Sequence, residues 1–98
     1  MPKYDVQITR TAENDLKSII EYILRDNKSA ANKWKGELKR QIESLENFPM
    51  RCQIIPEALE LGKNYRQLVY GNYRTIFEIN QSTVIILRVI HSAQLLNL

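Results

Sequence analysis

Residues 70–91 read YGNYRTIFEINQSTVIILRVIH, and this stretch decides what kind of fold the chain forms. β-Branched and aromatic residues dominate residues 73–79 and 83–91, and Gly71-Asn72 is a pair typical of a tight turn after a strand over residues 66–70. The segment 83–91 is apolar on both faces, which is typical of a central strand that is covered on both sides. The stretch therefore predicts an antiparallel meander of three strands.

The residues before the meander predict one strand and two helices. Alternation of apolar and polar residues over 3–8 is typical of a half-buried strand. Apolar stripes at helical spacing run through residues 12–24 and 31–48, with Ser29 as the expected N-cap of the second helix and Pro49 as its stop signal. The predicted order is β-α-α-β-β-β, an α+β fold in a single domain that takes up all 98 residues. A helical hairpin is expected to pack on one face of a twisted, mostly antiparallel sheet, with the first strand at one edge.

The composition limits the classes of protein to which the chain can belong. Apolar residues make up 44% and charged residues 26% of the sequence, which is ordinary for a globular domain, and the net charge is +3. The longest apolar run, Val84 to Leu87, is far shorter than the roughly 20 residues of a membrane span, and the N-terminus lacks the apolar core of a signal peptide. The single cysteine, Cys52, has no CxxC partner. We therefore expect a cytoplasmic protein that contacts no membrane and holds no metal or cofactor.

Two arginines lie within the predicted meander. Alternation places Arg74 on the sheet face away from the helices, and it places Arg88 on a face with Val84 and Ile86. Arginines on adjacent strands of an open sheet face can clamp a phosphate, because guanidinium offers paired donors in a rigid fork. The alternative is that Arg74 and Glu78, which lie on the same face, pair with neighbouring side chains and solvate that face.

Other candidate site residues lie at the ends of the predicted strands. His91 could act as an acid or base at the sheet rim, or it could be hydrogen-bonded at a strand terminus. Tyr73 could stack on a base, or it could pack across the strands. Arg66 lies opposite Phe77 on the helix-covered face if the turn has two residues, whereas a longer loop moves it to the face of Arg74. Its charge favours the longer loop.

Motifs spread over nearly the whole chain identify a family resemblance. The segments are YDVQITRTAENDLKSIIEYI at residues 4–23, LENFPMRCQIIPEALELGKNYRQLVYGNYRTIFEI at 45–79 and VIILRVIH at 84–91. In this order they resemble the RelE/ParE superfamily of toxins from type II toxin–antitoxin modules, also described as plasmid-stabilisation proteins. The resemblance implies the β-α-α-β-β-β fold that the periodicity predicts.

The resemblance implies two different activities. RelE-like members cleave messenger RNA in the ribosome, and the residues of this chain that match their cationic cluster are Arg66, Arg74 and His91, with weaker matches at Arg88 and Tyr73. ParE-like members inhibit DNA gyrase.

The end of the chain favours the ParE-like branch. Ser92 stands where RelE-like chains carry an arginine after the histidine, and no tyrosine follows. The ending HSAQLL is similar to the ParE ending, with Gln94 in place of its arginine. We therefore expect gyrase as the target, with a ribosome-dependent mRNA endonuclease and a degenerate, non-toxic antitoxin-binding module as alternatives. For a gyrase inhibitor, we expect Arg74→Ala to leave the fold largely intact.

The resemblance also implies a cognate antitoxin, which would form a hetero-oligomer with the toxin. Apolar residues that the core pattern does not claim are candidate contacts for it: Ile54, Ile55, Leu95, Leu96 and Leu98. The alternative for the last three is a tail that packs against its own sheet.

Overall fold

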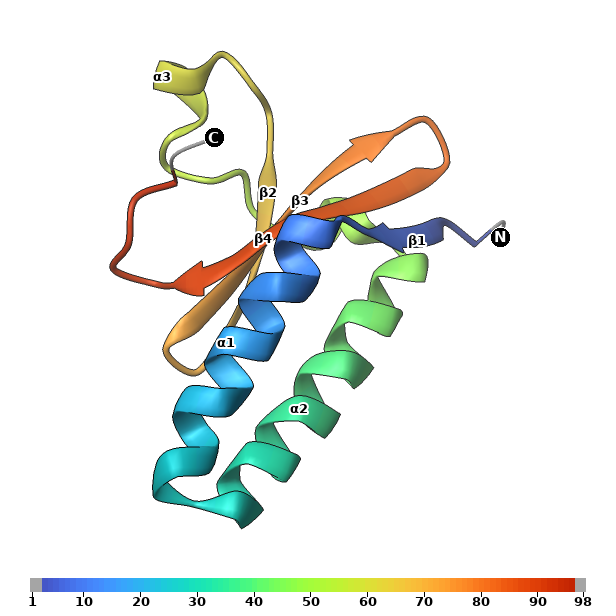
Figure 1. The fold of residues 1–98 in the computed structure, drawn as a ribbon. Helices are drawn as coiled ribbons and strands as arrows, with labels where there is room; N and C mark the ends of the chain where they lie inside the picture. The colour runs from blue at the N-terminus through green and yellow to red at the C-terminus, as the bar shows by residue number, and fades with distance from the viewer. Residues whose placement is uncertain (1–2, 97–98) are drawn as a thin grey trace.

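The computed structural model describes residues 3–96 and has the predicted order of long elements (Figure 1). The elements are β1 (Asp5–Ile8), α1 (Arg10–Asp26), α2 (Lys28–Glu43), the 3₁₀ turns η1 (Ser44–Glu46) and η2 (Pro49–Arg51), α3 (Ala58–Leu61), β2 (Arg66–Tyr70), β3 (Tyr73–Asn80) and β4 (Thr83–His91). The strands form one sheet in the order β1-β4-β3-β2, in which β1 is parallel to β4 and the other pairs are antiparallel. The predicted α+β fold, with β1 at one edge, is confirmed. None of the helices within residues 3–96 has the length and apolar character needed to cross a membrane.

A single residue, Asn27, separates the two long helices. Its backbone is extended, with φ −159° and ψ 112°, and its N–H donates to the carbonyl of Ile23 at the end of α1. Its side-chain oxygen accepts the N–H of Ala30 at 3.0 Å, so Asn27 also caps α2. The expected cap, Ser29, instead lies in the first turn of α2. The asparagine is the better cap because its side chain reaches the third amide of the helix while its backbone turns the chain.

Apolar side chains fill the sheet face that α1 and α2 cover. Two buried clusters on this face contain Ala12, Leu45, Cys52, Phe77, Val84 and Ile86, and Trp34, Leu38 and Val89. Burial raises the pKa of the Cys52 thiol. The helical stripes predicted from the sequence therefore supply this part of the core.

The opposite face of the sheet, which we call the far face, is also covered. Ile76 and Ile90 of the sheet pack there against Ile55, from the loop before α3, and Leu96, from the C-terminal segment. Figure 1 shows α3 and the C-terminal segment lying together, away from the helical hairpin. The doubly apolar pattern of residues 83–91 predicted cover on both faces, and this is confirmed, whereas the open face on which Arg74 was expected to lie is absent because residues 53–61 and 92–96 fold over it.

The β2–β3 hairpin has the shorter of the two turns considered from the sequence. Tyr70 pairs with Tyr73, and Gly71 supplies the positive φ of 57° that the two-residue turn needs. Arg66 consequently lies opposite Phe77, and the longer loop favoured by its charge is wrong. The charge is accommodated because the guanidinium reaches past the strand end to backbone carbonyls.

A β-bulge interrupts the pairing of β3 with β4. Ile76 pairs with Arg88 while the next residue, Phe77, pairs with Ile86, so Leu87 is an extra residue on β4. The bulge separates Arg88 from Ile86, which points to the helix-covered face. Simple alternation placed these two residues on one face and was wrong for that reason.

Candidate functional site

Arg74 lies at the centre of a buried polar cluster on the far face. Its Nη1 donates to Glu57 Oε1 and to Gln67 Oε1, both at 3.0 Å. Its Nη2 forms an ion pair with Glu57 and donates to the backbone carbonyl of Gln94 at 2.7 Å. Only 5% of Arg74 is exposed. Both terminal amino groups of the guanidinium are therefore engaged within the protein.

Glu57 joins this cluster to the C-terminal segment. Besides Arg74, its carboxylate accepts the backbone N–H of Leu96 at 2.8 Å. The hydrogen bonds from the Arg74 side chain, aided by the Leu96 N–H, lower the pKa of Glu57 to about 2 even though burial opposes the shift. The ion pair thus fixes residues 94–96 against the sheet.

Arg88 is engaged by a different element. Its Nε donates to Asp15 Oδ2 at 2.7 Å and its Nη2 to Asp15 Oδ1 at 3.2 Å, which joins β4 to α1. Asp15 Oδ2 also accepts the N–H of Val89 at 3.0 Å. This pairing with Asp15 raises the pKa of Arg88.

Arg66 and His91 lie apart from the Arg74 cluster. Arg66 Nη1 donates to the carbonyl of Cys52 at 2.7 Å and to that of Met50 at 3.2 Å. His91 is exposed at the end of β4, and its Nδ1 accepts the N–H of Ala93 at 3.1 Å. The structure therefore does not gather Arg66, Arg74, Arg88 and His91 around one point.

Tyr73 is the one candidate that His91 contacts. Their ring centroids are 5.7 Å apart in an edge-to-face arrangement, and Tyr73 packs in the same way on Trp34 at 5.4 Å. Tyr73 also packs against the helix-covered core, as cross-strand aromatic packing predicts. His91 and Tyr73 thus form a pair at the rim of the sheet, on the other face from Arg74.

The residues expected to contact a partner divide into two groups. Ile55 and Leu96 are buried in the far-face core, so the C-terminal segment packs against its own sheet at Leu96. Ile54 and Leu95 are exposed and remain free to contact another molecule. Leu98 lies outside the described residues.

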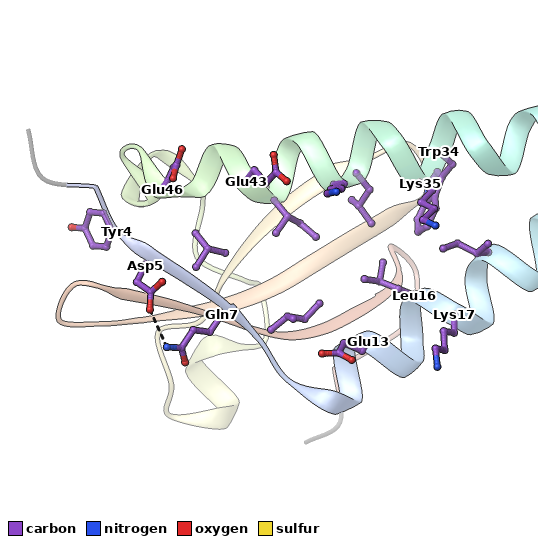
Figure 2. Close-up of a pocket in the computed structure, with 16 residues that line it drawn as sticks. Tyr4, Asp5, Gln7, Glu13, Leu16, Lys17, Trp34, Lys35, Glu43 and Glu46 are labelled. Atoms are coloured by element: carbon purple, nitrogen blue, oxygen red, sulfur yellow. Dashed lines mark hydrogen bonds between the residues drawn. The ribbon is translucent and has the colours of Figure 1, made fainter.

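Sequence reasoning missed a groove of about 740 Å³ at the β1 edge of the molecule. It lies between β1, α1 and α2, and Figure 2 shows side chains from all three elements around it. Its apolar lining consists of Tyr4, Val6, Ile8, Leu16, Ile20, Trp34, Leu38 and Ile42. The helical stripes include these α1 and α2 residues, but a stripe does not reveal that part of it is left uncovered.

The order of elements and the sheet topology are those expected from the resemblance to the RelE/ParE superfamily. The sequence profile described as the ParE toxin of the type II toxin–antitoxin system, parDE, matches residues 6–96, and the chain belongs to this family. No sequence among the curated proteins matches it.

Two solved structures share the fold. The chromosomal ParDE toxin–antitoxin system from P. aeruginosa includes a chain with a TM-score of 0.69 and 19% identity, over 91% of this chain and 96% of that one. The toxin–antitoxin complex RelBE2 from Mycobacterium tuberculosis includes a chain with a TM-score of 0.65 and 27% identity, over 96% of this chain and 97% of that one. The protein is thus similar in fold to chains from both ParDE and RelBE systems.

Proposed function

We propose that this type II toxin stops growth by inhibiting DNA gyrase and that a cognate antitoxin neutralises it in the cytoplasm by forming a hetero-oligomer with it. Membership of the ParE family supports the choice of target. The two similar structures come from toxin–antitoxin systems, which supports the choice of partner. The exposed side chains of Ile54 and Leu95 are available as antitoxin contacts.

The engagement of Arg74 is the observation that favours gyrase over messenger RNA. RNA cleavage through attack by a 2′-hydroxyl requires a general acid or base and cations that face the developing charge on phosphorus. The terminal amino groups of Arg74 donate hydrogen bonds to Glu57, Gln67 and Gln94, and the side chain is almost fully buried. A phosphate could bind these amino groups only by displacing the partners that they already have.

The remaining cations do not replace Arg74. Arg88 is paired with Asp15, and Arg66 is bonded to backbone carbonyls near η2. His91 lies on the other sheet face, beside Tyr73. An acid or base without a nearby phosphate clamp is a poor nuclease site, so a target that is bound rather than cleaved agrees better with this geometry.

Expression of the toxin without a partner tests the proposal. We expect arrested, filamentous cells with an induced DNA-damage response, and we expect the purified protein to block supercoiling of relaxed plasmid by gyrase. Co-expression of the polypeptide encoded by the neighbouring gene should restore growth.

Cleavage of ribosome-bound messenger RNA would contradict the gyrase proposal. If message is cut at codon positions and the cutting disappears in His91→Ala, the protein is an mRNA endonuclease and the gyrase proposal is wrong. If the protein is produced in folded form and cells grow normally, it is a non-toxic antitoxin-binding module.

A further inference from the structure

We propose that one exposed face of α2 binds the sugar–phosphate backbone of double-stranded DNA. The inference rests on the proposed function only in taking that DNA to be the substrate that gyrase holds. Three features of α2 carry it: the sign of its charge, the arrangement of its exposed side chains and a glycine among them.

The positive charge of the chain is concentrated on α2. This helix carries five basic and two acidic residues, a net charge of +3, which equals the net charge of the whole chain. Solvation of a helix does not require one sign of charge, so the bias of α2 points to a partner of negative charge. The exposed charged residues of the neighbouring α1 are instead balanced, with three of each sign: Arg10, Lys17 and Arg25, and Glu13, Glu21 and Asp26.

The exposed residues of α2 include two parallel rows that contain no carboxylate. Residues three and four apart lie next to one another on a helix surface. The eight residues of these rows, which we call the basic face, are Lys28, Asn32, Lys35 and Lys39 in one row and Ser29, Lys33, Gly36 and Arg40 in the other. Their ammonium, guanidinium, amide and hydroxyl groups are donors of the kinds that proteins use to bind phosphate oxygens. Each row spans about 16 Å at the helical rise of roughly 1.5 Å per residue, so it can contact several phosphates of one DNA strand.

Most cations of the basic face have no acidic partner. Arg40 pairs with Glu37, and no other cation of the face forms an ion pair within residues 3–96. The Arg40 side chain is 71% exposed, and exposed pairs of this kind exchange partners at little cost. The basic face can therefore accept an anion without breaking a buried contact.

Gly36 is a residue that the fold of the toxin does not require. A glycine in the interior of a helix destabilises the helix relative to alanine. A Cβ atom at Gly36 would meet nothing within 4 Å, so no packing contact explains the missing side chain. The helical neighbours of Gly36 are Asn32, Lys33, Lys39 and Arg40, which surround this bare position with hydrogen-bond donors. The arrangement lets a phosphate backbone come close to the helix while donors reach it from both sides.

Duplex DNA suits the basic face better than a single strand does. Its phosphates are regularly spaced along a stiff backbone, against which a straight helix can lie. Proteins that bind single strands usually stack the bases on exposed aromatic side chains, whereas the aromatic residue of α2, Trp34, is buried. We therefore expect α2 to contact the backbone of a duplex without reading its base sequence.

Fluorescence anisotropy of a short labelled DNA duplex of mixed sequence tests the binding. If about three phosphates are neutralised, the affinity of the purified toxin should fall about 40-fold when the salt concentration rises from about 50 to about 200 mM. No binding at the lower salt concentration would overturn the proposal.

Matched double substitutions locate the binding on α2. Lys28→Gln with Lys33→Gln removes two cations of the basic face that do not line the groove beside β1. At low salt, this variant should bind DNA about tenfold more weakly or worse, and the slope of log affinity against log salt should become shallower by about 2. The control is Lys3→Gln with Lys63→Gln, which removes the same charge at two exposed lysines outside α2 and should leave the slope unchanged. Equal losses in the two double variants would show that binding follows net charge and would overturn the assignment to α2.

Gly36→Gln tests the close approach of the DNA. Nothing obstructs a side chain at this position, so the variant should unfold at a higher temperature than the wild type. It should nevertheless bind the duplex several-fold more weakly, because the side chain keeps the phosphates away from the helix. A more stable variant that binds DNA like the wild type would contradict the role of Gly36.

Two competitors test the choice of DNA. We expect neither poly-glutamate at equal charge nor an RNA duplex of the same sequence to displace the DNA efficiently. Displacement by poly-glutamate would identify an acidic protein as the preferred occupant, and tighter binding of the RNA duplex would identify RNA. Either result would overturn the proposal.

The DNA contact and the gyrase proposal fail in different ways. We expect the variant with Lys28→Gln and Lys33→Gln to need about tenfold more toxin to block supercoiling, in line with its weaker binding to DNA. If it blocks supercoiling at the wild-type concentration, the DNA contact is wrong and the gyrase proposal stands. If the toxin binds DNA through α2 and leaves gyrase active, the gyrase proposal is wrong and the basic face remains a DNA-binding surface.

Discussion

The two faces of the sheet are covered by different means. Helices of 17 and 16 residues cover one face, and the residues buried beneath them are almost all apolar. The far face is covered by a loop, a four-residue helix and the C-terminal segment, held by four buried apolar residues and the Arg74–Glu57 ion pair. Long helices bring enough apolar area to bury most of a sheet face by packing alone, whereas short segments bring little and need directional bonds to hold them. The stability of the helix-covered face should therefore depend on the volume of its buried side chains, and the stability of the far face on its buried ion pair.

Loss of the far-face ion pair should cause the largest loss of stability. We expect Glu57→Gln to lower the free energy of unfolding by about 3–5 kcal/mol, because it leaves the buried Arg74 charge without its counterion. Urea denaturation of the purified toxin measures the change. The exposed Glu60 of α3 is the matched control, and Glu60→Gln should stay within about 0.5 kcal/mol of the wild type.

Arg74→Ala should be destabilising for the same reason, since it leaves Glu57 as the unpaired charge. The sequence alone predicted that this substitution spares the fold, and its burial now contradicts that prediction. A loss below about 1 kcal/mol in both variants would show that the pair does not hold the far face.

Truncation of a buried side chain beneath the helices should cause the next largest loss of unfolding free energy. Ile86→Ala and Leu38→Ala each remove a fully or nearly fully buried side chain, and we expect a loss of about 2–5 kcal/mol for each. Differential scanning calorimetry, at pH values where Glu57 stays ionised, measures the change. The exposed Val69 of β2 is the control, and a similar loss in Val69→Ala would undermine the assignment of this core.

The C-terminal segment offers a smaller test with a neighbouring control. Leu96 is buried on the far face, so Leu96→Ala should cost roughly 2 kcal/mol. Leu95 is 76% exposed, and Leu95→Ala should leave the unfolding midpoint unchanged. If the two variants unfold together, the C-terminal segment does not pack as described.

A moderate fall in pH should produce the smallest change in the free energy of unfolding. The pKa of Glu57 is about 2 in the folded protein and near 4.5 when unperturbed, so its stabilising contribution is complete above pH 4.5 and is lost as the pH falls toward 2. Unfolding free energies measured from pH 7 down to pH 3 should decline less steeply in Glu57→Gln than in the wild type. Parallel curves would show that Glu57 does not carry this dependence.

Periodicity predicted the parts of the fold that repeat along the chain. The amphipathic helices, the alternating first strand and the doubly apolar central strand were all recognisable, because burial imposes its own spacing on each. Which segments cover the far face was not recognisable, because Glu57 and Arg74 are 17 residues apart and no local pattern joins them. The bulge at Leu87 also was not predicted, and one extra residue in β4 reverses the sheet face to which alternation assigns the residues beyond it.

The contacts within the candidate site were likewise not predictable from local sequence patterns. The sequence identified Arg66, Arg74, Arg88 and His91 as unusual residues within a meander, but it could not show that each arginine already has partners. The groove beside β1 is formed by three elements, so its lysines and carboxylates are separated in the sequence and gather only in space.

The pairing of β1 with β4 has a consequence for how the toxin is made. Val6 and Val84 are partners, and they are 78 residues apart. At about 5–20 residues per second, the ribosome needs about 4–16 s to synthesise the chain between them. During that interval the helical hairpin has no sheet on which to bury its apolar stripe. The nascent chain therefore carries an uncovered apolar stripe until its last strand has been made, and that strand sets the earliest moment at which the sheet can be completed.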